Sequence, residues 1–182
     1  MPTYTVNLQS WASVSGPGSI GWFNPGNAEY ADGSIAKTNA VAGTGATTYL
    51  EGTNPTPISP AANEVIQSIT ATATRASTGA TTDDVIALIV GGNVTSMNKA
   101  SGATWPSTLT ATTYNWSFGD LLSLGIVLAT VQASNFGVAL AANLNGASGN
   151  GATVDAIVLT IDTAIQPAPV GGNNVLPPYG IR

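Results

Sequence analysis

The fold is decided by the stretch EVIQSITATATR, which runs from Glu64 to Arg75. In an extended chain, alternate side chains point to opposite faces. One face then carries Val65, Gln67, Ile69, Ala71, Ala73 and Arg75, and the other carries Ile66, Ser68, Thr70, Thr72 and Thr74. Because β-branched residues are frequent and the pattern has a period of two, we predict a long, half-buried antiparallel strand.

Other short apolar or alternating runs predict further strands, and turn-forming residues separate them. These runs are Tyr4 to Leu8, Thr47 to Glu51, Val85 to Val90, Val94 to Met97, Leu109 to Trp116, Asn135 to Ala142 and Val154 to Ile161. Gly91-Gly92-Asn93 predicts a tight hairpin turn. The one helix expected is a short one within Ala129 to Ser134. This rhythm is typical of an all-β sandwich or barrel, which we assign to residues 1–165.

The C-terminal residues 166–182 have a different composition. They are rich in Pro and Gly, which predicts an extended arm without regular structure. Its apolar residues are Val175, Leu176, Tyr179 and Ile181. An unstructured terminus and an arm that docks on a neighbouring subunit are both consistent with this composition.

The composition argues against an enzyme. The 182 residues include no histidine, no cysteine and only four lysines and arginines. A histidine-based triad, a thiol nucleophile and a zinc–thiolate site are therefore excluded, and no cofactor is expected. Two of the nine carboxylates could serve a glycosidase, but nothing in the sequence marks such a pair.

The same composition limits the partners. A net charge of −5 with so few basic residues argues against binding to nucleic acid. The longest apolar stretch, Leu121 to Val131, is interrupted by polar residues and is shorter than a membrane span, so no membrane partner is expected. Asp83, Asp84 and Asp155 could surround calcium, but their spacing matches no EF-hand loop. We favour solvent-facing aspartates that cap turns, and predict no metal.

Two features mark candidate contact surfaces. Only 7% of the residues are charged while 43% are hydrophobic, so part of the exterior is expected to be buried against other subunits. The candidate interface residues are Leu121, Leu122, Leu124 and Ile126, together with Val175, Leu176, Tyr179 and Ile181. Trp105 precedes Pro106 in a loop of small residues and is the aromatic ring most expected to be exposed. Such a ring could stack on a sugar, whereas the aromatic residues as a set are better explained by core packing.

Several short motifs, in order along the chain, carry a family resemblance. They are Asn24-Pro25-Gly26-Asn27-Ala28, Asp32-Gly33-Ser34, Tyr49-Leu50, Thr82-Asp83-Asp84-Val85, Asn98-Lys99-Ala100-Ser101, Trp105-Pro106, Ala133-Ser134-Asn135-Phe136-Gly137-Val138 and Val154-Asp155. Together they resemble a β-sandwich module of tailed-bacteriophage virion proteins. The resemblance implies a jelly-roll-like antiparallel sandwich and supplies no catalytic residues.

The resemblance also implies a function. We expect a capsid decoration, or cement, protein that forms a homotrimer and bridges subunits of the major capsid protein. It would be made in the bacterial cytoplasm and would act on the surface of the virion. The alternative is a fibre or tail adhesin that binds glycans through an exposed aromatic ring such as Trp105.

Overall fold

The computed structural model describes residues 1–40, 43–145 and 149–166, and these form an all-β protein. Eleven strands lie within them: β1 (Thr3–Val14), β2 (Trp22–Phe23), β3 (Ala36–Thr38), β4 (Gly45–Ala46), β5 (Tyr49–Pro55), β6 (Glu64–Ser77), β7 (Ala80–Val90), β8 (Asn93–Val94), β9 (Thr110–Ser117), β10 (Gly137–Asn145) and β11 (Ala152–Ile165). Two short helices, α1 (Phe118–Ser123) and α2 (Leu128–Val131), and a 3-10 turn, η1 (Pro25–Ala28), accompany them.

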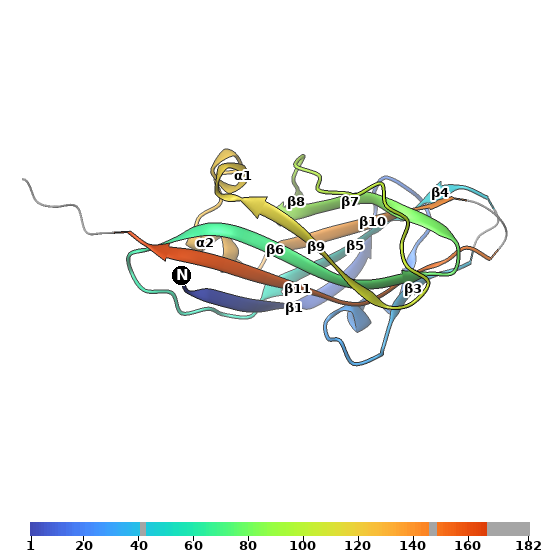
Figure 1. Cartoon of the computed structure of the whole chain (residues 1–182), viewed down its shortest axis with the longest axis horizontal. Helices are drawn as coiled ribbons and strands as arrows, with labels where there is room; N and C mark the ends of the chain where they lie inside the picture. The colour runs from blue at the N-terminus through green and yellow to red at the C-terminus, as the bar shows by residue number, and fades with distance from the viewer. Residues whose placement is uncertain (41–42, 146–148, 167–182) are drawn as a thin grey trace, which may run out of the picture.

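The strands form two layers that are joined by β1. Residues Thr3 to Asn7 of β1 pair with β11, whereas Leu8 to Val14 pair with β5. In the first layer, β6 lies between β9 and β11, and β3 and β2 follow beyond β11. The second layer runs β5, β10, β7 and β8, with β4 on β10. The pairings between these strands are all antiparallel, and the sheet does not close into a barrel. The predicted antiparallel, sandwich-like fold is confirmed, and Figure 1 shows its strands along the long axis.

The core lies between the two layers. Its largest fully buried side chains come from both of them and include Ile69, Trp116 and Ile157 from the first layer and Leu88 and Leu140 from the second. In β6, the predicted alternation holds from Ile69 to Arg75. It is wrong before that point, where Ile66 is buried and Val65 and Gln67 are only half-buried. The reason is a β-bulge, because the pairing with β11 passes from Ile66 to Ser68 without a partner for Gln67.

A second bulge brings a carboxylate into the interior. In the pairing of β7 with β10, Asp83 lies opposite Ala142 and Val85 lies opposite Ala141, so Asp84 is the extra residue. The extra residue places Asp83 and Ile86 on the same face, and both are buried. The prediction that the aspartates face solvent is therefore wrong for Asp83, which is 7% exposed, and it is also wrong for Asp155, which is 6% exposed.

The predicted hairpin turn is confirmed by the pairing of Ile89 with Val94 across Gly91 and Gly92, but the strand predicted over Val94 to Met97 ends at Val94. Both of these glycines have positive φ, which glycine adopts without steric cost. The expected short helix overlaps α2, whereas α1 was not predicted. Neither helix of the described chain is long and apolar enough to cross a membrane.

The last strand ends where the described part of the chain ends. β11 ends at Ile165, and the next residue, Gln166, donates from its backbone N–H to the carbonyl of Asn63 at 2.8 Å. The Asn63 side chain donates in return to the carbonyl of Gln166 at 3.2 Å. The predicted arm beyond this point, with Val175, Leu176, Tyr179 and Ile181, lies outside the described residues.

Candidate functional site

An apolar groove lies between the two short helices and the first residues of β6. Its volume is about 320 Å³. The lining residues are Glu64, Val65 and Ile66 of β6, Phe118, Leu121 and Leu122 of α1, and Ile126, Val127, Leu128 and Ala129 at and before α2. The walls are therefore almost wholly apolar, and Glu64 is the charged side chain among the lining residues.

The helix α1 is held in place by its first turn. The Ser117 side chain accepts from the backbone N–H of Asp120, and the Asp120 carboxylate accepts from the backbone N–H of Ser117 at 2.8 Å. This is a capping box, which satisfies donors that the start of a helix leaves free. Lys99 Nζ also donates to Asp120 at 2.9 Å. The hydrogen bond from Lys99, together with those from Ser117, lowers the pKa of Asp120.

The chain reverses direction between α1 and α2 at Gly125. This glycine has φ of +66°, a conformation that is strained for other residues. After the reversal, the backbone N–H of Ile126 donates to the carbonyl of Leu121 at 2.9 Å. Leu121 and Ile126 are both buried and anchor the two helices to the core. The turn thus places α2 beside α1, and both helices line the groove.

Large apolar side chains are left in contact with solvent around the groove. Phe118 is 50% exposed, Leu122 is 69% exposed and Val127 is 59% exposed. Single exposed apolar residues are ordinary on protein surfaces, but these three line one concave site. Contiguous apolar surface of this kind marks a binding site more often than a random surface does.

The groove contains one ionisable group, Glu64, which is 8% exposed. Its carboxylate accepts hydrogen bonds from Thr163 Oγ1 at 2.6 Å, from Tyr4 Oη at 2.9 Å and from the backbone N–H of Ala61 at 3.1 Å. The bond from Thr163 contributes most to lowering the pKa of Glu64, although burial acts in the opposite direction. The carboxylate is therefore ionised near neutral pH and satisfied by the protein itself.

The structure brings some of the predicted interface residues together. Leu121, Leu122 and Ile126 all line the groove, but only Leu122 is largely exposed, because Leu121 and Ile126 contribute mainly to the core. Leu124 packs partly against the core and does not line the groove. The four arm residues lie outside the described residues. Sequence reasoning missed Phe118, and the available signal was the spacing of Ser117 and Asp120, which marks a helix that begins at Phe118.

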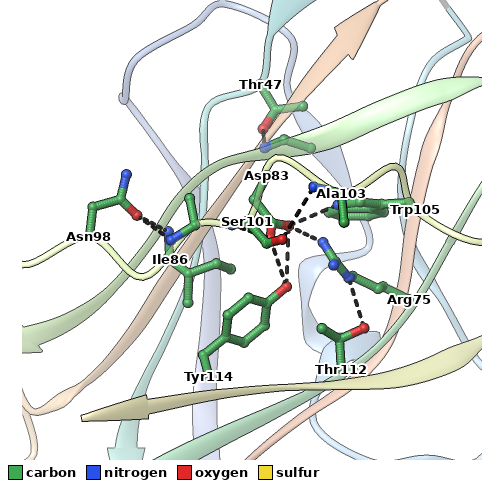
Figure 2. A network of polar contacts seen from close by, with 12 residues as sticks. Thr47, Arg75, Asp83, Ile86, Asn98, Ser101, Ala103, Trp105, Thr112 and Tyr114 are labelled. Atoms are coloured by element: carbon green, nitrogen blue, oxygen red, sulfur yellow. Dashed lines mark hydrogen bonds and ion pairs between the residues drawn. The ribbon is translucent and has the colours of Figure 1, made fainter.

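A second cluster of polar side chains lies in the interior and is shown in Figure 2. Arg75 of β6 forms an ion pair with Asp83 of β7. The other Asp83 contacts are hydrogen bonds from Trp105 Nε1 at 2.8 Å, from Tyr114 Oη at 3.0 Å and from the backbone N–H of Ser101 at 2.9 Å. The Arg75 guanidinium lies 4.5 Å from the centre of the Trp105 ring, within the range of a cation–π contact. Burial raises the pKa of Tyr114 to about 12.

This cluster corrects the prediction for Trp105. The ring is 3% exposed, so it is not available to stack on a sugar. Sequence reasoning expected an exposed ring because the neighbouring residues are small and polar. The indole instead lies in the interior, where its N–H donates to Asp83 and its face contacts the Arg75 guanidinium. The cluster is closed to solvent and its groups satisfy one another, which gives it a structural role.

The aspartates considered for calcium have separate partners. Asp83 pairs with Arg75, whereas Asp155 accepts from the backbone N–H of Gly33 at 3.0 Å. Within the described ranges, no three His, Cys, Asp or Glu side chains gather as metal ligands would.

Comparison with known proteins adds no relative to this description. Neither protein-family models nor curated protein sequences match the chain. The groove and the composition are the features of the chain that bear on its function.

Proposed function

We propose that this chain is a non-enzymatic structural protein that acts by association, as a decoration protein on the capsid of a tailed bacteriophage. The single observation that carries the proposal is the apolar groove beside α1 and α2, with Phe118, Leu122 and Val127 exposed around it. A surface of this kind lowers its free energy when another protein covers it, by about 25 cal/mol for each Å² of apolar area.

The surface charge is consistent with assembly. Only 7% of the residues are charged, so electrostatic repulsion opposes close packing of copies less than on an ordinary protein surface. Many identical contacts in a symmetric array can add up to firm attachment even when each contact is weak. The proposal includes a homotrimer that bridges neighbouring subunits of the major capsid protein, because the resemblance implies one.

The adhesin alternative loses its main support. It relied on an exposed aromatic ring, of which Trp105 was the first candidate, and the Trp105 ring is buried against Arg75 and Asp83. We therefore retain association with the capsid as the function to test first.

The decisive experiment is quantitative mass spectrometry of phage particles purified from cells that produce this protein. A copy number comparable with that of the major capsid protein supports decoration of the capsid. A small copy number assigns the chain to a fibre or tail component. Absence from the particles would refute the virion proposal.

A paired substitution tests the groove itself. Leu122→Asp places a charge on the exposed side of the groove, whereas Leu109→Asp changes another exposed leucine outside it. We expect Leu122→Asp to weaken binding of the purified protein to undecorated particles by about tenfold or more, as loss of a central apolar contact does. Leu109→Asp should bind as the unchanged chain does. Equal binding of all three proteins would exclude the groove as the contact.

A further inference from the structure

One edge of the first layer, at β9, has no neighbouring strand among the described residues. β9 pairs with β6 along its whole length, from Thr110 opposite Arg75 to Ser117 opposite Ser68, and the register contains no bulge (Figure 1). Within the described ranges, no backbone–backbone hydrogen bond outside that pairing reaches residues 111–116. Half of the backbone N–H and C=O groups of an edge strand point away from its neighbour. β9 therefore presents a regular row of free donors and acceptors.

The sequence of β9 lacks the usual protection of an edge strand. Proteins prevent unwanted pairing with a charged side chain, a proline, a bulge, a very short strand or a covering segment. β9 is eight residues long, and its sequence TATTYNWS contains no charge and no proline. No charged residue stands between Lys99 and Asp120 in the sequence, and these two pair with each other. The side chains of β9 thus offer no charge that would repel a second strand.

The outer edge of β7 shows what a protected edge looks like in this protein. β8 pairs with the last residues of β7, and the chain after β8 follows the same edge. There the backbone N–H of Lys99 donates to the carbonyl of Ile86 at 2.8 Å. Further along, the backbone N–H of Trp105 donates to the carbonyl of Thr81 at 2.7 Å. At the far end of the first layer, β2 has only two residues. β9, in contrast, is long and is covered by no strand of the described chain.

The side chains of β9 show which strand fits this edge. Tyr114 and Trp116 are buried, whereas Ala111, Thr113 and Asn115 are exposed. An antiparallel copy of β9, with Thr113 opposite Thr113, brings Ala111 opposite Asn115 and keeps the buried faces of both strands on one side of the sheet. Cross-strand threonine pairs are favourable, and like charges do not meet because the strand has none. A second copy therefore supplies a strand matched in length, charge and face.

We propose that β9 pairs antiparallel with β9 of a second copy of this chain. The pair has a twofold axis and joins the two first layers into one continuous sheet. This contact is separate from the groove beside α1 and α2. Within the proposed function, a twofold contact does not build the trimer and instead joins one trimer to the next.

Charge substitutions at Thr113 test the pairing. Thr113→Lys and Thr113→Asp each place like charges opposite one another, whereas a mixture of the two variants places opposite charges there. Sedimentation velocity of the full chain measures association for each variant alone and for the mixture. The matched controls are Thr5→Lys and Thr5→Asp, on an exposed threonine of β1 that pairs with Thr160 of β11. Circular dichroism verifies the fold of each variant.

We expect the unchanged chain to self-associate and each Thr113 variant alone to associate about tenfold or more weakly, because like charges across an interface are strongly unfavourable. The mixture of the two Thr113 variants should recover the association. The Thr5 variants should associate as the unchanged chain does. A monomeric unchanged chain would overturn the proposal. Association that is insensitive to charge at Thr113, or that mixing does not restore, would overturn it as well.

The outcome is separable from that of the proposed function. If the protein pairs through β9 but is absent from particles, the contact between copies stands and the virion assignment is wrong. If the protein is abundant in particles but its association is insensitive to charge at Thr113, the virion assignment stands and the contact is wrong.

Discussion

Arg75 and Asp83 form an ion pair that connects the two layers of the sandwich. Arg75 lies on β6 in the first layer and Asp83 lies on β7 in the second. The two side chains are 3% and 0% exposed. A buried charge is costly unless it is paired and hydrogen-bonded, and here Trp105, Tyr114 and the backbone of Ser101 complete the pairing.

Breaking this pair is expected to destabilise the fold strongly. Arg75→Met leaves the Asp83 charge buried without its partner and should lower the free energy of unfolding by about 3–5 kcal/mol. Urea denaturation followed by tryptophan fluorescence measures the change. The double variant Arg75→Met with Asp83→Leu removes both charges and should be more stable than Arg75→Met alone. If the double variant lost as much stability as Arg75→Met and Asp83→Leu lose together, this account would be wrong.

The hydrogen-bond donors around Asp83 can be tested one at a time. Trp105→Phe removes the indole N–H, and Tyr114→Phe removes the hydroxyl group. Each change should cost about 1.5–3 kcal/mol in the free energy of unfolding, because each bond is made to a charged group. Because both donors bind one carboxylate, the effects should not be additive in the double variant. If each variant lost less than about 0.5 kcal/mol and the two losses were additive, the Asp83 carboxylate would be solvated and would not depend on these donors.

The sequence was sufficient to predict most strands, because each has an alternating or continuous apolar pattern along its own length. It was not sufficient to predict the bulges at Gln67 and Asp84, since a bulge depends on the register of two strands that are far apart in the chain. The direction of Asp83 therefore could not be derived from its own neighbours. Trp105 is buried because its indole donates to the inward-pointing Asp83, so the burial of Trp105 could not be predicted either.

Three of the predicted interface residues, Leu121, Leu122 and Ile126, line the groove. Their part in an interface stays a prediction. The sequence could not separate Leu122, which is exposed, from Leu121, which is buried, because no helix was predicted over Phe118 to Ser123. Ser117 and Asp120 have the spacing of a capping box and were the available signal.

Asn98 stabilises the bulge in β7. Its side chain donates to the carbonyl of Asp84 at 2.8 Å and accepts from the backbone N–H of Ile86 at 2.9 Å. It thus takes the place of a neighbouring strand at this edge. Asn98→Ala should cost about 1–2 kcal/mol in the free energy of unfolding and should speed hydrogen exchange at the amide of Ile86.

The matched control for Asn98 is Asn93, in the hairpin just before it. The Asn93 side chain is exposed and donates to the carbonyl of Gly91 at 3.2 Å. Asn93→Ala should change the free energy of unfolding by less than about 0.5 kcal/mol. Equal losses for the two variants would show that the Asn98 contacts with the bulge have no special role.

Two glutamates are expected to affect the pH dependence of stability in opposite directions. Hydrogen bonds, chiefly from Thr163, lower the pKa of Glu64 below its ordinary value of 4.5, whereas burial raises the pKa of Glu51. At a pH near 4.5, the unfolded chain holds more protons on Glu64 than the folded chain does. The contribution of Glu64 is therefore complete above its unfolded pKa and is lost as the pH falls through its folded pKa. For Glu51 the sign is reversed, because burial disfavours the ionised form in the folded chain.

These signs can be measured with Glu64→Gln and Glu51→Gln. Glu64→Gln should be less stable than the unchanged chain at neutral pH, and the difference should shrink as the pH falls toward about 3. Glu51→Gln should be more stable than the unchanged chain at neutral pH, and its advantage should also shrink in acid. Urea midpoints recorded across this pH range give both differences. If the loss of stability in Glu64→Gln stayed constant with pH, the Glu64 side chain would contribute packing and not charge. The hydrogen bonds from Thr163, Tyr4 and Ala61 would then not explain the stability of this end of the sandwich.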